Sequence, residues 1–378
     1  MHASLQGLLI RQRRLKRNWS QSGLCQGICA VSYLSKIEQG RAEGSREILD
    51  LLFARLGIAW REDPAFCRES QRWFDGCYDR LFSLEDMSQE QKDLREAGDR
   101  YRDTPFFLDF LLLSGAVQNR LPPEAEAFVP AMDPRQYGLY LFLSGREEEL
   151  LRDYANGFYQ VQAGQRAYQQ GDYSRAIALL LRAWDLACRE GAPWLMLHCR
   201  LLLGNCYSDL GQFSQMQAHY QAATRLARAL GDEEALTDIA YNLASTELEL
   251  GRTQEAYLHF LEHPQSGAMY FHKLAICCEQ LGMPQEALGY LDQALAAVPD
   301  GAVDRELLVQ MCDLIRYRLD HPGYLRDQAY GKALERCVRE LAEMLPMGYA
   351  RFHLPWLEEW YTANRQYKQA YELRKKFS

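Results

Sequence analysis

The segment AGQRAYQQGDYSRAIALLLRA, residues 163–183, recurs with changes three times further along the chain. The later copies read LGNCYSDLGQFSQMQAHYQAA (203–223), LASTELELGRTQEAYLHFLE (243–262) and LAICCEQLGMPQEALGYLDQA (274–294). Each copy begins with a pair of small or apolar residues and has glycine seven residues after the second member of that pair. Alanine or methionine follows five residues after the glycine. Self-similarity of this length indicates a stack of helix pairs.

The shared positions have a mechanical explanation. Glycine adopts the left-handed backbone conformation that ends the first helix of a pair, and small residues let the two helices approach closely. The pattern resembles tetratricopeptide repeats over residues 157–300, although its glycines are 40, 40 and 31 residues apart and the usual period is about 34. The glycines are Gly171, Gly211, Gly251 and Gly282, and the residues that follow them are Ala176, Met216, Ala256 and Ala287.

The rest of the chain also predicts helices. Periodic apolar segments are separated by Pro and Gly, and strand-like alternation between hairpin turns is missing. Residues 66–156 contain helical segments with weak mutual similarity, and residues 304–345 predict a helix pair without the repeat motif. Residues 346–378 predict a truncated unit whose polar last helix caps the stack.

The first 60 residues hold a different helical pattern. The segments LQGLLIRQRRLKRN (5–18), QSGLCQGI (21–28), YLSKIEQ (33–39) and REILDLLFARLG (46–57) predict four short helices. The N-caps are predicted at Ser20, Ser32 and Ser45. The residues predicted to be buried are Leu5, Leu8, Leu9, Leu15, Leu34, Ile37, Ile48, Leu49, Leu52, Phe53 and Leu56.

Residues 5–58 resemble the lambda-repressor-like (XRE) helix-turn-helix domains. Ser20-Gln21 opens the second helix, Ile37-Glu38 and the following glycine close the third, and an amphipathic helix comes next. The turn is one residue shorter than the commonest form of the family. GICAVSYLSKIE is nevertheless similar to the variant in a peptide-regulated branch. The resemblance implies DNA binding.

In such domains the third helix lies in the major groove and its N-terminal residues touch base edges. The outward side predicted to meet DNA holds Ser32, Tyr33, Ser35 and Lys36. A lysine donates to guanine acceptors, and serine hydroxyls pair with several bases. The ordinary alternatives are an N-cap role for Ser32 and a solvated surface position for Lys36.

Further contacts are predicted around the third helix. Gln21 lies beside the free N–H groups at the start of the second helix, which are suited to a phosphate. Arg41 and Arg46 flank the third helix and are predicted to hold the DNA backbone or enter the minor groove. The resemblance also implies a structural ion pair between Arg14 and Glu38, which would tie the first helix to the third.

The charge is unevenly distributed. The chain has a formal net charge of −8, yet residues 1–60 contain nine Lys/Arg and only four Asp/Glu. The remaining residues contain 34 basic and 47 acidic side chains. A basic head on an acidic body suits a head that binds a polyanion, although chance clustering on a solvated helix would give the same balance.

A helix-turn-helix head joined to tetratricopeptide-like repeats resembles the RRNPP regulators of Gram-positive bacteria. The resemblance implies a quorum-sensing transcription regulator whose concave repeat surface binds a short signalling peptide, and the peptide changes DNA binding or the arrangement of a dimer. One small head makes too few base contacts for useful specificity. We therefore expect a homodimer on a palindromic double-stranded operator.

The concave surface of such a stack is lined by the first helix of each pair. Asn205 is the preferred peptide anchor and Asn242 the second, because a side-chain amide both donates to and accepts from an extended peptide backbone. Leu201 and Ile276 are predicted to form side-chain pockets. Each position is alternatively an ordinary residue on or between helices. The predicted groove residues are Gln162, Gln165, Tyr168, His198, Leu201, Asn205, Asp209, Tyr241, Asn242, Ser245, Glu249, Met269, His272, Ile276 and Glu279.

The predicted organisation follows from these patterns. Gly57 and Pro64 mark a boundary, so we expect a helix-turn-helix domain at 1–60, a linker at 61–66 and a repeat domain at 67–378. The predicted fold class is all-α, with the N-terminal helix-turn-helix followed by a right-handed α-solenoid of tetratricopeptide-like helix pairs.

Other classes of protein find little support. No phosphate loop, nucleophile elbow or HExxH motif is present, so neither an enzyme nor a cofactor is predicted. Neither His nor Cys has zinc-ligand spacing, and no metal is expected. No apolar run of about 20 residues could cross a membrane. Eleven scattered cysteines in a long chain favour the reduced thiols of a cytoplasmic protein.

Two alternatives remain open for the repeats. They would bind a folded protein partner, as in a scaffold or antitoxin-type regulator, or act on phosphorelay proteins. The aromatic residues near the end have core spacing, with a dimer interface as the alternative; they are Trp356, Trp360, Tyr361, Tyr367 and Tyr371.

Overall fold

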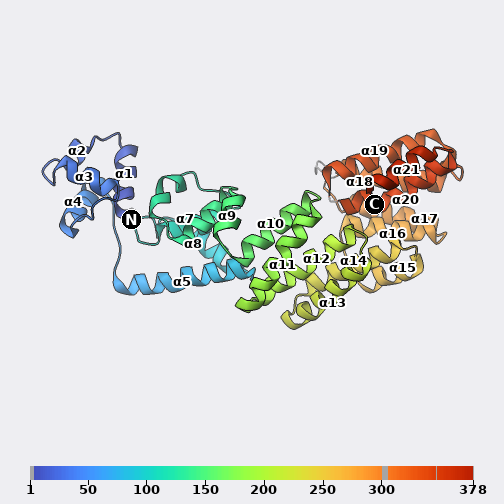
Figure 1. Cartoon of the computed structure of the whole chain (residues 1–378), viewed down its shortest axis with the longest axis horizontal. Coiled ribbons are helices and arrows are strands. Elements are labelled where there is room, and N and C mark those ends of the chain that lie inside the picture. The colour runs from blue at the N-terminus through green and yellow to red at the C-terminus, as the bar shows by residue number, and fades with distance from the viewer. Residues whose placement is uncertain (1–3, 300–304, 346, 378) are drawn as a thin grey trace. The chain divides into compact units, whose positions relative to one another are not determined.

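The computed structural model describes residues 4–299, 305–345 and 347–377 (Figure 1). Every regular element in these ranges is a helix, which confirms the predicted all-α class. The chain forms two compact units, residues 1–159 and 160–378, which are described separately.

Unit 1 begins with four short helices: α1 Leu5–Lys16, α2 Gln21–Cys25, α3 Val31–Glu38 and α4 Arg46–Leu56. The predicted caps at Ser20 and Ser45 are confirmed, because their hydroxyls accept from the N–H groups of Gly23 (3.0 Å) and Ile48 (3.5 Å). The predicted cap at Ser32 is wrong. Ala30 is the extended residue that precedes α3, so Ser32 already lies within the helix.

The predicted core of these four helices is mostly confirmed. Leu34 and Leu52 are fully buried, and Ile10, which the prediction left out, is buried beside them. Leu15 is an exception, since 47% of its surface is exposed. The neighbouring Arg14 is the buried residue of this turn, so α1 turns a charged side chain inward where the apolar pattern predicted a leucine.

The remainder of unit 1 continues the same hydrophobic core. Its elements are α5 Pro64–Ser83, α6 Ser88–Glu96, α7 Phe107–Val117, the 3-10 helix η1 Ala125–Ala131, α8 Pro134–Leu143 and α9 Glu147–Asp153. Asp63 caps α5 by accepting from the N–H of Phe66 at 3.0 Å, and Phe66 is buried. Helical structure therefore begins inside the segment 61–66 that was predicted as a linker.

Unit 2 is a succession of helix pairs. From α11 to α21 each helix packs on the next one along the chain (Figure 1). The pairs are α10 Gly157–Gln169 with α11 Tyr173–Glu190, α12 Pro193–Asp209 with α13 Phe213–Leu230, α14 Glu233–Glu249 with α15 Thr253–Glu262, α16 Ala268–Gln280 with α17 Pro284–Ala296, α18 Arg305–Asp320 with α19 Gln328–Met344 (joined through the 3-10 helix η2 Tyr324–Arg326), and α20 Met347–Ala363 with α21 Tyr367–Phe377.

The repeat motif has the predicted mechanics. The four motif glycines lie two residues beyond α10, α12, α14 and α16, all with positive φ between 66° and 76°. The four residues that follow them are buried, as close helix packing requires. In the last pair Arg365 occupies the glycine position, with φ of 59°. The final unit thus keeps the turn without the residue that adopts it most easily.

The aromatic residues near the end divide into two groups. Trp356, Trp360 and Tyr361 are buried, as predicted from their spacing. Tyr367 and Tyr371 are 62% and 67% exposed, so their assignment to the core is wrong. Both lie on α21, the last helix, and no further helix of the described chain covers that face.

Candidate DNA interface and ligand pocket

The turn between α2 and α3 is held in place by hydrogen bonds from a side chain of α4. Gly27 has φ of 75° in the connection, and Ala30 leads directly into α3. Arg55 of α4 donates from Nη1 to the carbonyl oxygens of Leu24 (2.7 Å) and Gln26 (2.6 Å). These bonds satisfy the exposed C-terminal carbonyls of α2 and hold the turn against α4.

A buried charged network orients α3. Arg14 donates from Nε and Nη2 to the two carboxylate oxygens of Glu38 at 2.6 and 2.8 Å, so the predicted ion pair is confirmed. Gln21 donates from Nε2 to the same carboxylate at 2.8 Å. Helices α1, α2 and α3 of the N-terminal head (residues 5–56) therefore meet at the Glu38 carboxylate. The Gln21 side-chain amide keeps a second N–H, which can donate to a phosphate.

The predicted DNA face of α3 contains two kinds of side chain. Ser32 and Lys36 are exposed. Tyr33 is half-buried and its hydroxyl donates to the Glu43 carbonyl at 2.9 Å, which braces the loop after α3. Ser35 is half-buried and accepts from Gln39 at 3.0 Å.

Three further residues bear on this face. Arg41 and Arg46 are both exposed, and Arg46 has only a long 4.0 Å contact with Glu62. Val31, which sequence reasoning missed, opens α3 with 44% of its surface exposed. Val31 would have been predicted on this face if the N-cap of the third helix had been assigned to Ala30 rather than to Ser32.

Unit 2 contains a polar cavity of about 220 Å³, here called the repeat pocket. Its lining residues come from six helices: α10, α12, α13, α14, α16 and α20. Helix α13 contributes Tyr220 to this lining. Its lining residues are Tyr168, Asn205, Ser208, Asp209, Tyr220, Tyr241, Asn242, Ser245, Thr246, Glu249, Met269, Lys273, Gly348 and Tyr349. Eight of the predicted groove residues are among them: Tyr168, Asn205, Asp209, Tyr241, Asn242, Ser245, Glu249 and Met269.

The two asparagines are held in fixed orientations. The Tyr220 hydroxyl donates to Oδ1 of Asn205 at 2.7 Å, and Nδ2 of Asn242 approaches the same oxygen at 3.5 Å. This leaves the Asn205 amide nitrogen and the Asn242 carbonyl oxygen as a donor and an acceptor beside the cavity. The Ser245 hydroxyl is closed to solvent and has no hydrogen-bond partner within the described chain.

Other predicted groove residues lie elsewhere. His272 and Ile276 are fully buried, so their predicted place in the groove is wrong. On α16 the pocket-facing residues are Met269 and Lys273, one helical turn apart. Met269 was predicted for the groove, but Lys273 lines the pocket in place of the predicted His272, and a step of one residue rotates a side chain by about 100° around the helix.

The first two repeats contribute less than predicted. Gln162 and Gln165 are half-buried on α10 and do not line the repeat pocket. His198 is half-buried with Nδ1 bonded to the Trp194 carbonyl at 3.0 Å. Leu201 packs against the apolar cluster between α12 and α13. These four residues form no common site with the asparagines.

The last helix pair packs against the second pair through α20 and α12. α20 contacts α12, Arg351 donates from Nη1 to the Asp209 carbonyl at 2.5 Å, and Gly348 lies so close to Asp209 that a Cβ there would be 2.3 Å from Oδ1. The Tyr173 hydroxyl donates to the Asp209 carboxylate at 3.0 Å. Burial raises the pKa of Asp209 above its usual range. One side of the repeat pocket is thus built by residues about 140 positions away in sequence.

A second cavity of about 370 Å³ adjoins the first and shares Glu249 with it. Its walls are mainly apolar. They comprise Phe213, Leu248, Gly251, Gln280, Arg351, Phe352, Pro355 and Trp356, besides Glu249. A polar chamber beside an apolar one suits a ligand that alternates backbone amides with bulky side chains.

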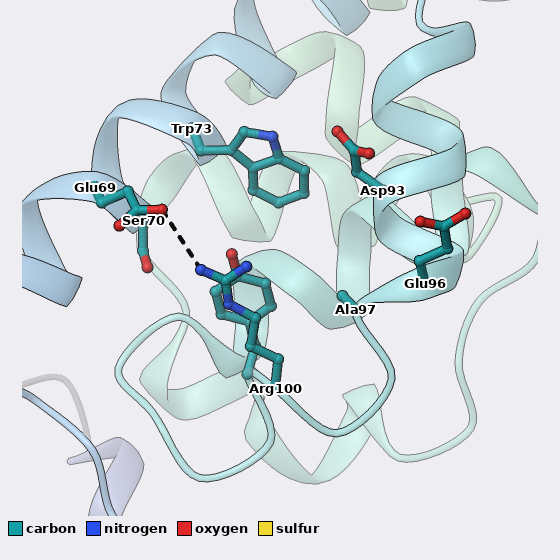
Figure 2. Close-up of a pocket in the computed structure, with 8 residues that line it drawn as sticks. Glu69, Ser70, Trp73, Asp93, Glu96, Ala97 and Arg100 are labelled. Atoms are coloured by element: carbon teal, nitrogen blue, oxygen red, sulfur yellow. Dashed lines mark ion pairs between the residues drawn. The ribbon is translucent and has the colours of Figure 1, made fainter.

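Unit 1 has a cavity of its own, about 320 Å³ in volume, with an acidic rim (Figure 2). Glu69, Asp93 and Glu96 border it around the Trp73 ring, which stacks on Tyr101 at 6.0 Å. Figure 2 shows Arg100 inside this group, paired with Glu69 at 3.5 Å. The Arg100 guanidinium lies 5.4 Å from the centroid of the Tyr101 ring. The chain itself therefore supplies the cation that the carboxylates and aromatic rings of this cavity attract.

Within the described ranges, no three His, Cys, Asp or Glu side chains group in a way that would hold a metal. All eleven cysteines are free thiols, and only Cys188 is exposed. Over the same ranges, no helix is long and apolar enough to span a membrane.

Comparison with known proteins agrees with this architecture. A helix-turn-helix family matches residues 10–62, and a tetratricopeptide repeat family matches residues 197–230. The transcriptional activator NprA of Geobacillus stearothermophilus is 25% identical over 273 residues, which cover 63% of this chain and 66% of NprA. The chain therefore spans just under two thirds of the length of that relative.

Two solved structures are similar to nearly the whole chain, and the first of them shows the same fold. The Rap conjugation gene regulator of plasmid pLS20, in complex with the Phr* peptide, has a TM-score of 0.50 at 14% identity, covering 98% of this chain and 95% of that one. NprR in complex with its cognate peptide NprX has a TM-score of 0.46 at 16% identity, covering 97% and 99%. The family matches and the fold of the Rap regulator confirm the predicted architecture, a helix-turn-helix followed by tetratricopeptide-like helix pairs.

Proposed function

We propose that this protein is a sequence-specific transcription regulator whose repeat pocket binds a short signalling peptide that switches its DNA binding or dimer arrangement. The carrying observation is the combination of two sites in one chain: a braced α2–α3 head, and a pocket where Asn205 and Asn242 present a fixed amide pair. The relationship to a transcriptional activator and the shared fold of a peptide-bound Rap regulator support this combination.

The DNA contacts follow from exposure. Ser32 and Lys36 are the exposed α3 residues that reach base edges, and Arg41 and Arg46 are exposed cations placed to neutralise phosphates. Gln21 adds a phosphate contact from the start of α2. Tyr33 and Ser35 act mainly by shaping the surface, since both already bond within the head.

The peptide contacts follow from the pocket. An extended peptide cannot satisfy its own backbone groups, so a receptor that accepts many side chains must offer both a donor and an acceptor. The Asn205–Asn242 pair does so, with Tyr168 and Tyr241 as neighbouring walls. A homodimer on a palindromic operator remains part of the proposal, because one head of this size reads only a short half-site.

The head is tested with Lys36→Ala against Lys16→Ala, an exposed lysine at the end of α1. Fluorescence anisotropy would follow binding to labelled duplex from the region upstream of this protein's own coding sequence. Loss of a base-reading lysine should weaken specific binding by about tenfold or more. The Lys16 change should leave the preference over scrambled DNA intact.

The same titration is repeated with a peptide fraction from the producing culture. A shift in DNA affinity, or in the mass of the complex, would support the peptide switch. If the wild type shows no preference over scrambled DNA and Lys36→Ala binds as the wild type does, the assignment of α3 is overturned. Sequence-specific binding that ignores every peptide fraction would favour a folded protein partner for the repeats.

A further inference from the structure

Lys273 is a buried lysine at the wall of the repeat pocket. It lies on α16 with 7% of its surface exposed, one turn after Met269, and both residues line the cavity. Its Nζ is 2.9 Å from the centroid of the Phe352 ring. No carboxylate within the described ranges lies within 4 Å of the amine. Burying an ammonium without a paired anion is costly.

The neighbouring acids do not remove this cost. Glu249 lines the same pocket, yet it makes no ion pair with Lys273 in the described chain. Asp209 already has partners, since the Tyr173 hydroxyl donates to its carboxylate and Arg351 donates to its carbonyl oxygen. Burial lowers the pKa of Lys273, whereas the charge of Glu249 acts in the opposite direction. In the pocket Asp209 already has its partners, whereas the Lys273 amine feels the charge of Glu249 without forming an ion pair with it in the described chain.

An incoming group that completes this arrangement is therefore an anion. We propose that Lys273 binds a carboxylate of the peptide ligand, so that the protein selects peptides that place an acidic group beside the Asn205–Asn242 pair. This inference rests on the proposed peptide binding and deepens it by naming the chemistry of one ligand group. Inside a cavity of low polarity such a pair discriminates strongly, because a ligand without the anion leaves the amine buried and unpaired.

Two sources of the carboxylate fit the site: the C-terminus of the peptide and an Asp or Glu side chain. The probe is a pool of randomised pentapeptides made with free C-termini, and the same pool made with C-terminal amides. Full-length protein is incubated with each pool, and retained peptides are identified by mass spectrometry. Individual peptides are then measured by isothermal titration calorimetry.

Three variants are measured beside the wild type. Lys273→Met removes the charge and keeps a long, flexible side chain over Phe352. Lys332→Met is the matched control, since Lys332 is exposed on α19. Lys273→Arg keeps the positive charge and should retain the preference for carboxylates. Because Lys273→Arg predicts a retained preference, it stays informative if Lys273→Met fails to fold.

A C-terminal carboxylate is supported if free-acid peptides bind at least about tenfold more tightly than their amides and Lys273→Met abolishes the difference. A side-chain carboxylate is supported if the amidated pool is enriched in Asp and Glu and Lys273→Met removes that enrichment. Peptides retained without any dependence on carboxylates would overturn this inference and leave the proposed function standing. Retention of no peptide from either pool would overturn both.

Discussion

Arg14 and Glu38 carry opposite charges inside the head, with 8% and 2% of their surfaces exposed. Such a pair adds little net stability compared with apolar residues, but the removal of one partner strands the other charge. Here the stranded group would lie at the junction of α1, α2 and α3. The pair therefore holds the recognition helix in position and is expected to be sensitive to a single neutral substitution.

We expect Glu38→Gln to destabilise the head by about 3 kcal/mol. Hydrogen–deuterium exchange of residues 5–56 would measure the loss as faster exchange of the helix amides. Glu43→Gln is the control, because Glu43 is exposed and contributes only its carbonyl to Tyr33. Equal protection in Glu38→Gln and wild type would show that the pair is not required for the fold of the head.

Arg365 stores a small amount of backbone strain at the turn between α20 and α21. Four other repeats place glycine at the same point. We expect Arg365→Gly to stabilise unit 2 by about 0.5–1 kcal/mol, less than the full cost of a left-handed residue, because glycine also loosens the unfolded chain.

Thermal unfolding would measure the gain as a higher Tm. Arg339→Gly gives the opposite control, since Arg339 is exposed within the regular helix α19. That change should cost about 1 kcal/mol. A lower Tm for Arg365→Gly would mean that the arginine side chain makes a contribution larger than the strain.

At the scale of elements, close helix packing supports the repeat pocket. Gly204 of α12 faces Tyr220 of α13, where an added Cβ would lie 2.3 Å from a ring carbon. The same tyrosine orients Asn205. We expect Gly204→Ala to destabilise unit 2 by about 1–3 kcal/mol and to weaken peptide binding, because the ring must move.

The same substitution at Gly289 is the matched control. Gly289 is exposed in the middle of α17, and an added Cβ meets nothing within 4 Å. Gly289→Ala should therefore raise stability by up to about 1 kcal/mol through helix propensity. Calorimetry of both variants, with and without peptide, separates packing from propensity. If both alanines raise the Tm equally, the α12–α13 contact is looser than described.

At the scale of the whole molecule, two neutral histidines lie in the core of unit 2. His272 and His353 are 0% and 1% exposed, with ring centroids 6.1 Å apart. Burial lowers the pKa of His353 from 6.5 to about 4 and lowers that of His272 as well. Above pH 6.5 both the folded and the unfolded chain hold neutral rings, so neither histidine then makes stability depend on pH.

Below pH 6.5 the unfolded chain binds protons that the folded chain does not. Stability therefore falls as pH drops towards about 4, by at most about 3 kcal/mol for His353. We expect His353→Gln to flatten this decline, because glutamine keeps a donor for the Tyr349 carbonyl and does not titrate. Urea denaturation between pH 4.5 and 7 measures the difference as about 1.4 kcal/mol per pH unit at most. Parallel curves would mean that His353 is solvated or protonated in the folded protein.

The sequence carried the local features of this fold. Ser20 and Ser45 as caps and the motif glycines as turns were predictable, because each depends on residues near one helix end or on a pattern that recurs. Asn205 and Asn242 were found for the same reason, since the repeat frame locates their face of the helix. The Arg14–Glu38 pair joins two helices, and only the resemblance to XRE domains implied it.

The same reasoning failed where a rotation of one residue matters. Ser32 was predicted as the N-cap of α3, but the N-cap is Ala30. Leu15 was predicted to be buried, but Arg14 is the buried residue of that turn. On α16 the prediction selected Met269 correctly, but it also selected His272 and Ile276 and passed over Lys273. Apolar periodicity cannot resolve a shift of this size on a helix that is buried on nearly every side, as α16 is.

By itself the sequence determined an all-α chain, the helix-turn-helix head, the repeat period and the asparagine face, since these follow from caps, glycine turns and periodicity. Only the tertiary structure decided which side chains share the repeat pocket. Gly348 and Arg351 meet the end of α12 because the stacked pairs bring α20 back onto it. Small rotations between successive helix pairs add up along a stack, and no local pattern of residues encodes their sum.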